Sequence, residues 1–370
     1  MATKVFGKPV LRKEDPPLIQ GSGMFIADLH LPGMVHMEIL RSPHAHARII
    51  SIDTSAAAAM PGVLKIVTGA DLIGRMKPLP CVWVPGGVES HFPSHPNDIP
   101  GAGMPLTSDI TRYIGDGVAA LVAETRAQAI DALSHIHVEY EVLPAVTRAF
   151  DALAEGAPQI HPEVPGNLNA HWWCGRKEAT EQAIAAAEVV VSLDLINQRT
   201  INNPIEPRGA LATYDPVTDE FVLYASSQSP HNHRLILCYY VLNINMNKLR
   251  VISPNVGGSF GTKGYVYPDM PLVLLMTRDL KRPVKWVDSR RGMMRSTVQG
   301  RDHRQHGTIA GTRDGRITAL HCTSYANLGA YPSTIGPGVA TAMMGRSISG
   351  TYAIPDAYCE VYAAYTNTVP

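Results

Sequence analysis

The chain has 370 residues, more than one ordinary hydrophobic core supports, so we expect two or three domains. Hydrophobic residues make up 45% and charged residues 17%, which is the composition of a globular protein and excludes an intrinsically disordered chain. Lys plus Arg and Asp plus Glu both number 32, so the formal charge is zero and the sequence indicates no basic surface for nucleic acid.

The five cysteines are scattered and include no C-x-x-C pair. This spacing predicts neither a zinc site nor a disulfide framework, and it excludes an iron–sulfur cluster held by four clustered thiolates of this chain. The first residues lack the apolar core of a signal peptide, and no segment approaches the roughly 20 apolar residues of a membrane span. We therefore expect a cytoplasmic protein with no membrane span; export to the periplasm with a signal-bearing partner stays open.

The first part of the chain divides into an arm and a small domain. Residues 1–34 are rich in Pro and Gly and predict an extended N-terminal arm. Two strand–helix–strand patterns follow, the second with a helix capped by Thr125, and they predict an α/β domain over residues 35–144. Strands are expected at residues 35–40, 47–53, 63–67, 117–123 and 136–142.

An irregular segment, residues 77–106, interrupts this small domain. Its length and its many prolines and glycines are typical of a functional loop or an interface arm. It contains His91 and His95, which we interpret as loop histidines and not as metal ligands, since no Cys, Asp or Glu stands at ligand spacing.

The second part of the chain predicts a larger α+β domain. Residues 145–180 contain several prolines and are interpreted as a linker, in which Trp172 and Trp173 anchor one domain on the other. Residues 181–370 alternate strand and helix patterns, with one hairpin around Asp215 and another turn at Asp314 and Gly315. Strands are expected at residues 189–195, 209–214, 221–225, 249–252, 282–287, 306–310 and 317–325.

A glycine-rich loop at residues 256–263 is the first candidate site. An apolar strand pattern precedes it, and a largely apolar segment at 265–280, long enough for a helix, follows it. Strand, glycine loop and helix together present backbone N–H groups to an anion or a polarised oxygen. A plain tight turn explains the loop alone equally well, because neither phosphate-binding fingerprint is present.

Gln228 is the second candidate, at a strand-to-helix corner where Ser229 and Pro230 form an N-cap and first helical residue. Its amide can donate and accept hydrogen bonds, so it could hold an oxo group or a water. The alternative is a turn glutamine that bonds local backbone. His231, His233 and Arg234 follow in the helix, and we interpret them as packing or anion contacts.

The order of these features resembles one family, the molybdopterin-binding large subunit of the xanthine dehydrogenase and carbon monoxide dehydrogenase group, known as molybdenum hydroxylases. The resemblance implies a small α/β hammerhead domain followed by the first part of a mixed α+β molybdopterin-binding domain. The stretches that carry it are residues 12–23, 40–48, 113–119, 138–144 and 203–210, the Gln228 corner and the loop at 257–263.

The resemblance also implies roles for individual residues. Gln228 matches the glutamine that hydrogen-bonds an oxygen ligand of molybdenum. The cofactor's dithiolene holds the metal in this family, so no protein side chain is expected as a metal ligand. The implied cofactor contacts are Gly257, Gly258, Ser259, Phe260, Gly261 and Thr262. The cofactor is molybdopterin with molybdenum, and its mononucleotide and cytosine dinucleotide forms both stay open.

Two departures from the family pattern limit which family properties can be expected of this chain. Purine-oxidising members have a glutamate where this chain has Gly264, which argues against a purine substrate. The chain also stops at Pro370, before the family's arginine–glycine segment, the second half of the cofactor domain and the glutamate that acts as general base. We therefore expect the first half of a split large subunit, or a fragment.

The activity implied by the resemblance is hydroxylation of an N-heteroaromatic or aldehyde carbon with water-derived oxygen. Two electrons would pass to an iron–sulfur subunit and an FAD subunit, and a second polypeptide would complete the active site. The alternatives are a carbon monoxide dehydrogenase-type subunit and a non-catalytic structural half-subunit of such a complex.

Overall fold

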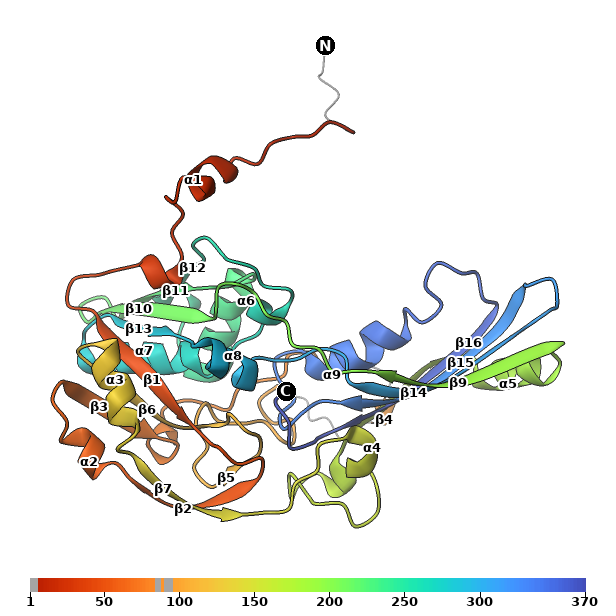
Figure 1. The fold of residues 1–370 in the computed structure, drawn as a ribbon, viewed down its shortest axis with the longest axis horizontal. Coiled ribbons are helices and arrows are strands. Elements are labelled where there is room, and N and C mark those ends of the chain that lie inside the picture. Colours follow the sequence, from red (N-terminus) through yellow and green to blue (C-terminus); the bar gives the residue numbers. More distant parts are fainter. Residues whose placement is uncertain (1–5, 84–87, 90–95) are drawn as a thin grey trace.

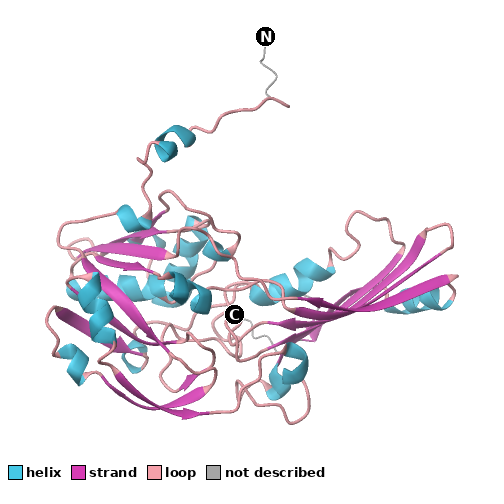
Figure 2. Ribbon diagram, in the orientation of Figure 1, coloured by secondary structure: helices cyan, strands magenta, loops and turns pink. Residues whose placement is uncertain are grey.

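The computed structural model describes residues 6–83, 88–89 and 96–370, and three sheets organise them (Figure 1). His91 and His95 lie outside the described residues. Figure 2 shows helices mixed among the strands, and the predicted α+β class is confirmed. Within the described ranges, none of the helices combines the length and apolar character needed to cross a membrane.

The largest sheet joins strands from both halves of the chain. Strand β1 runs parallel to β13, so Val35 pairs with Val284 across 249 residues of sequence (284 minus 35). The strands predicted for the small domain thus continue into the sheet of the second half. In order, the strands are β12 (Leu249–Ile252), β11 (Glu220–Ala225), β10 (Gly209–Asp215), β13 (Val284–Val287), β1 (Val35–Arg41), β6 (Gly117–Ala123) and β3 (Val63–Thr68).

Strand β6 is buried at all seven positions, which explains its uninterrupted apolar sequence. Helix α7 packs on β10, and its residues 269–277 are all buried, so it too is apolar around its circumference. The described helices are α1 (Asp15–Ile19), α2 (Ser55–Ala58), α3 (Arg126–Leu133), α4 (Ala149–Ala152), α5 (Lys177–Ala185), α6 (Pro230–Leu235), α7 (Asp269–Leu280), α8 (Arg290–Ser296) and α9 (Gly336–Gly338).

The second large sheet projects from the rest of the molecule (Figure 1). Strand β8 lies inside it, although residues 145–180 were predicted as a linker. Trp172 is buried in the core of this sheet, whereas Trp173 points to the opposite face and contacts the His171 ring. The strands, in order, are β4 (Val88–Glu89), β8 (Leu168–Gly175), β16 (Asp356–Ala364), β15 (Ile317–Asn327), β14 (His303–Gly311) and β9 (Val189–Asn197).

The N-terminal arm projects from the body of the molecule. The predicted extended arm contains the short helix α1 and leads away from the seven-stranded sheet (Figure 1). It joins the body where Ile26 is buried and Lys285 Nζ donates to the carbonyls of Ala27 and Leu29 at 2.6 and 2.8 Å.

The third sheet is small. It contains β5 (Ile110–Thr111), β2 (Ala47–Asp53) and β7 (His137–Val142).

Three buried histidines predict how stability depends on pH. Burial lowers the pKa of His161, His233 and His303 to about 4. Because the unfolded chain then binds more protons than the folded chain, the free energy of unfolding should fall as the pH drops from about 6.5 through about 4. Each histidine should contribute a loss of about 2 kcal/mol between about pH 7.5 and about pH 5.

Three carboxyl groups oppose this trend, because burial raises the pKa of Asp116, Glu38 and Asp288. Burial raises the pKa of Asp116 to about 6, so its contribution is lost as the pH rises from about 4 to about 6. Burial also lowers the pKa of His36, His46 and His321, so six histidines should outweigh the three carboxyl groups. Urea unfolding at about pH 7.5 and at about pH 5 measures the pH dependence of the unfolding free energy. The proteins compared are the wild type, His303→Asn and the exposed control His306→Asn. We expect only His303→Asn to flatten the pH dependence; equal stability of the wild type at both pH values would contradict it.

Candidate functional site

The glycine loop is held in a conformation that requires two of its glycines. Gly258 has φ of 91° and Gly261 has φ of 94°, both in the left-handed region that a Cβ atom disfavours. Phe260 also has a positive φ of 52°, and Asn202 Nδ2 donates to its carbonyl oxygen at 2.8 Å. A Cβ atom on Gly261 would meet no atom within 4 Å, so the backbone there borders open space.

A buried ion pair ties the two ends of this loop together. Glu206 Oε2 accepts from Gly257 N at 2.8 Å and from Lys263 Nζ at 2.6 Å. The Lys263 side chain is completely buried, and burial lowers its pKa against the opposing effect of Glu206. One carboxylate therefore holds the first glycine and the last lysine of the loop, which leaves the backbone between them little freedom to move.

Gln228 lies against the loop, as the resemblance implied. Its backbone N–H donates to the Lys263 carbonyl at 3.2 Å, and Ser259 Oγ donates to its side-chain oxygen Oε1. Ser259 Oγ in turn accepts from Lys263 N at 3.1 Å. With Oε1 engaged, the NH₂ group of Gln228 remains as the donor of this exposed side chain.

Gly264 lies beneath the same amide. A Cβ atom at this position would be 3.3 Å from Gln228 Nε2 and 3.4 Å from Cδ, closer than side chains normally pack. The absence of a side chain at residue 264 therefore leaves the room that Gln228 occupies in this conformation.

The corner that carries Gln228 is supported from behind. Helix α6 begins at Pro230 as predicted, but Ser229 makes no side-chain cap; Ser227 Oγ accepts from Ser229 N at 2.9 Å instead. The same hydroxyl bonds His233 Nδ1 at 3.0 Å, and His233 is completely buried, so the packing interpretation is confirmed for it. Arg234 bonds the Met246 carbonyl at 2.9 and 2.6 Å and thereby fixes the following turn.

A cavity of about 540 Å³ borders the loop. Phe260, Gly261 and Thr262 form one wall, whereas Gln228, Gly257, Gly258 and Ser259 do not line it. The opposite walls come from the segments after α8 and after β15, together with the end of the chain. These walls are residues 298–301, His303, Asn327, Leu328, Ser333, Gly336, Val339, Ala340 and Pro370.

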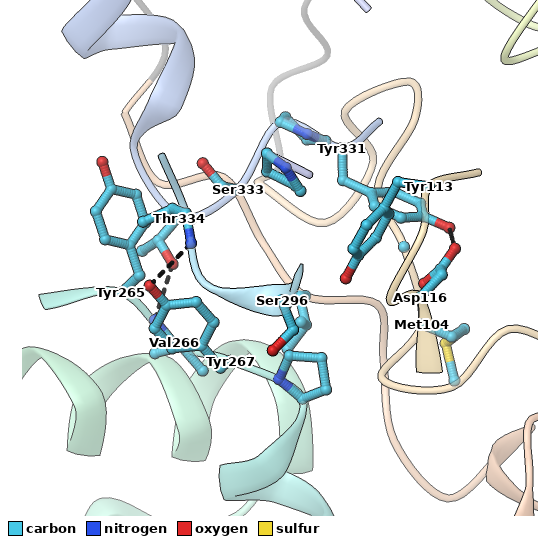
Figure 3. Close-up of a pocket in the computed structure, with 16 residues that line it drawn as sticks. Met104, Tyr113, Asp116, Tyr265, Val266, Tyr267, Ser296, Tyr331, Ser333 and Thr334 are labelled. Carbon is cyan, nitrogen blue, oxygen red and sulfur yellow. Dashed lines mark hydrogen bonds between the residues drawn. The ribbon is translucent and has the colours of Figure 1, made fainter. Parts of the chain in front are cut away.

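A smaller cavity of about 70 Å³ lies next to it and is rich in tyrosines (Figure 3). Tyr113, Tyr267 and Tyr331 line it, and Tyr331 OH donates to the buried Asp116 carboxyl at 2.8 Å (Figure 3). The two cavities share four lining residues: Tyr265, Val298, Ser333 and Pro370.

Sequence reasoning did not single out Glu206, Asn202 or the wall formed by residues 298–303. Glu206 carried one weak signal, since it is an acidic residue between two prolines in the stretch at 203–210. Nothing in the spacing pairs it with Lys263, 57 residues later.

Family models match both halves of the chain. A model described as the aldehyde oxidase and xanthine dehydrogenase a/b hammerhead domain matches residues 20–144, and the molybdopterin cofactor-binding domain matches residues 160–370. The chain belongs to the molybdenum hydroxylase family. It resembles the family's large subunits in fold and sequence.

Several large subunits are similar to this molybdenum hydroxylase chain. The carbon monoxide dehydrogenase large chain of Hydrogenophaga pseudoflava is 35% identical over 97% of this chain and 44% of its own length. The nicotine 6-hydroxylase large subunit of Paenarthrobacter nicotinovorans is also 35% identical, over 99% and 44%. The crystal structure of quinoline 2-oxidoreductase from Pseudomonas putida 86 has a TM-score of 0.89 and 34% identity, over 98% and 45%. This chain spans less than half the length of these relatives.

The loop fits the family's pterin cofactor at the level of the backbone. Glycines in the left-handed backbone conformation let N–H groups approach a ligand without Cβ atoms in between. The backbone of Gly261 faces free space. The Gln228 NH₂ group adds a side-chain donor beside this backbone. Both kinds of donor suit a cofactor that carries negatively charged oxygen atoms.

Proposed function

We propose that this chain is the first half of a molybdenum hydroxylase large subunit that hydroxylates an N-heteroaromatic or aldehyde carbon with water-derived oxygen. The observation that carries the proposal is the position of the Gln228 amide. Its oxygen accepts a hydrogen bond from Ser259, in a loop where Gly258 and Gly261 have positive φ. Two similar proteins, the nicotine 6-hydroxylase subunit and quinoline 2-oxidoreductase, are named for N-heteroaromatic substrates, which favours that class.

Each part of the loop has a distinct task in this proposal. Molybdopterin with molybdenum supplies two-electron redox chemistry when bound. The backbone from Gly257 to Thr262 holds the cofactor by close approach, and Gln228 Nε2 donates a hydrogen bond to an oxygen atom of the bound group. The exposed Phe260 ring forms an apolar wall of the neighbouring cavity and orients a planar substrate.

Partner polypeptides complete the enzyme in this proposal. Electrons pass to iron–sulfur and FAD groups on other subunits, and the cysteines of this chain stay free, with Cys81, Cys238, Cys322 and Cys359 buried. The rest of the cofactor domain closes the 540 Å³ cavity and contributes the general base. Gly264 provides no carboxylate for a purine.

Gln228→Ala in the assembled enzyme tests the proposal. Loss of one preorganised donor should lower kcat by about 100-fold, with KM changed much less. Ser259→Ala, which frees the amide to rotate, should give a smaller loss of about tenfold. Gln182→Ala on the exposed face of α5 is the control and should leave kcat unchanged. Full turnover by Gln228→Ala on every accepted substrate would remove this residue from the site.

A carbon monoxide dehydrogenase activity is the second candidate, favoured by the 35% identity to the Hydrogenophaga pseudoflava large chain. The same purified enzyme distinguishes the two. Oxidation of carbon monoxide, with no turnover of quinoline-like heterocycles or aldehydes, would replace the first proposal by the second.

A further inference from the structure

Strand β9 is exposed along its whole length. All nine residues from Val189 to Asn197 are exposed, and six of them are large aliphatic residues whose exposure ranges from 40% to 82%. A strand at a solvated surface normally alternates apolar and polar residues, because successive side chains point to opposite faces. An edge strand of this composition marks a surface that another chain segment covers.

The strand register places four of these six aliphatic residues, Val189, Val191, Leu193 and Leu195, on one face of the sheet. Val191 pairs with Ile309, and Leu193 pairs with Gly307, where a Cβ atom would meet nothing within 4 Å. Val191, Leu193, Leu195 and Ile309 therefore form one apolar surface, which we name the β9 face. None of these side chains is charged, and all four are at least 40% exposed.

The β9 face continues a core that is covered further along the sheet. Gly307 pairs with Cys322, and Cys322 pairs with Cys359; both cysteines are buried in the core around Trp172. The helical turn Val339–Met343 packs over β8, β15 and β16 in that region, on the side where Figure 1 shows α9. Over β14 this cover ends at Gln305, whose Nε2 lies 3.9 Å from Met344 Sδ, and none of the described helices packs extensively on β9.

The length of the relatives indicates the occupant, and the contacts beside the end of β9 indicate where it would lie. Arg199, two residues beyond the end of β9, donates to the Val369 carbonyl and to Thr368 Oγ1, both at 2.8 Å. Residue 370 therefore lies beside the end of β9. The relatives are more than twice as long as this chain, so a large part of their subunit has no counterpart here.

We propose that the remaining part of the large subunit docks on the β9 face through an apolar surface of its own. This inference rests on the proposed function, which requires such a part. It adds the place where the two parts meet. The contact would extend the core around Trp172 across the whole sheet and would hold the completing part beside the 540 Å³ cavity, whose wall includes Pro370.

A photo-crosslinking experiment on the assembled enzyme tests the contact. Benzoylphenylalanine placed at Leu193 should crosslink to the remaining part of the large subunit. The same group at Val217, an exposed residue in the β10–β11 turn, is the control and should not. A crosslink from position 193 to a second copy of this chain, a crosslink to an iron–sulfur or flavin subunit, or no crosslink at all would each overturn the proposal.

A substitution gives an independent measurement. Leu193→Lys should reduce the amount of assembled complex on size exclusion by at least about tenfold, whereas Val217→Lys should not change it. Normal assembly of Leu193→Lys would overturn the β9 contact alone. If the unmodified chain never assembles with a completing part, the proposed function itself fails.

Discussion

Gly258→Ala should lower the molybdenum and pterin content of the purified enzyme by about tenfold, while Gly315→Ala leaves both unchanged. Both glycines have φ near 90°, so both substitutions impose similar backbone strain of about 1–2 kcal/mol. A Cβ atom added at residue 258 also meets Pro204 at 3.1 Å and Phe260 at 3.3 Å, whereas at residue 315 nothing lies within 4 Å.

The comparison isolates the loop from general destabilisation. Gly315 lies in the turn between β14 and β15, so its variant reports strain without a change near Gln228. Metal analysis by mass spectrometry and fluorescence of the oxidised pterin measure the two contents. Equal contents in both variants would show that the loop backbone does not hold the cofactor.

Arg208→Leu should cost about 3–5 kcal/mol of unfolding free energy, the largest stability effect that we expect of a single side chain. The Arg208 guanidinium is buried, forms ion pairs with Asp269 and Asp288, and stacks 3.8 Å from the Tyr267 ring. Its removal leaves two buried carboxylates without their paired cation, although Arg41 still interacts with Asp288. The loss should therefore be larger at about pH 8 than at about pH 5.

Arg282→Leu is the matched control. Arg282 contacts a single carboxylate, that of Glu124, through two nitrogens at 2.7 and 2.8 Å, and its side chain is 34% exposed and that of Glu124 44%. Its loss should cost at most about 1 kcal/mol. Urea unfolding of the two variants measures the difference. Similar costs would mean that the Arg208 network does not hold the segment with Glu206 against α7.

Local sequence patterns predicted most secondary structure because local chemistry decides it. The Thr125 cap is confirmed: its hydroxyl accepts from Gln128 N at 3.2 Å, and Gln128 Oε1 accepts from Thr125 N at 3.0 Å. Strand β12 occupies the predicted residues, and α7 begins four residues after the apolar segment starts, beyond Pro268.

Long-range features were predicted poorly from the residues themselves. Strand β8 was not predicted, because the prolines before residue 166 are typical of a linker and lie in the same segment. The parallel pairing of β1 with β13 has no local signal. Gln228 and Ser259 are 31 residues apart, so no local pattern predicts their contact. The position of Gln228 beside the loop was expected from the resemblance alone.

The molybdenum and pterin content of the native enzyme tests the central claim most directly. Purified with its partners, the enzyme should contain close to one molybdenum and one pterin for each copy of this chain, and both should be absent from a complex that lacks the chain. Molybdenum and pterin that persist at full content without this chain would show that it is a structural partner and that another polypeptide holds the cofactor.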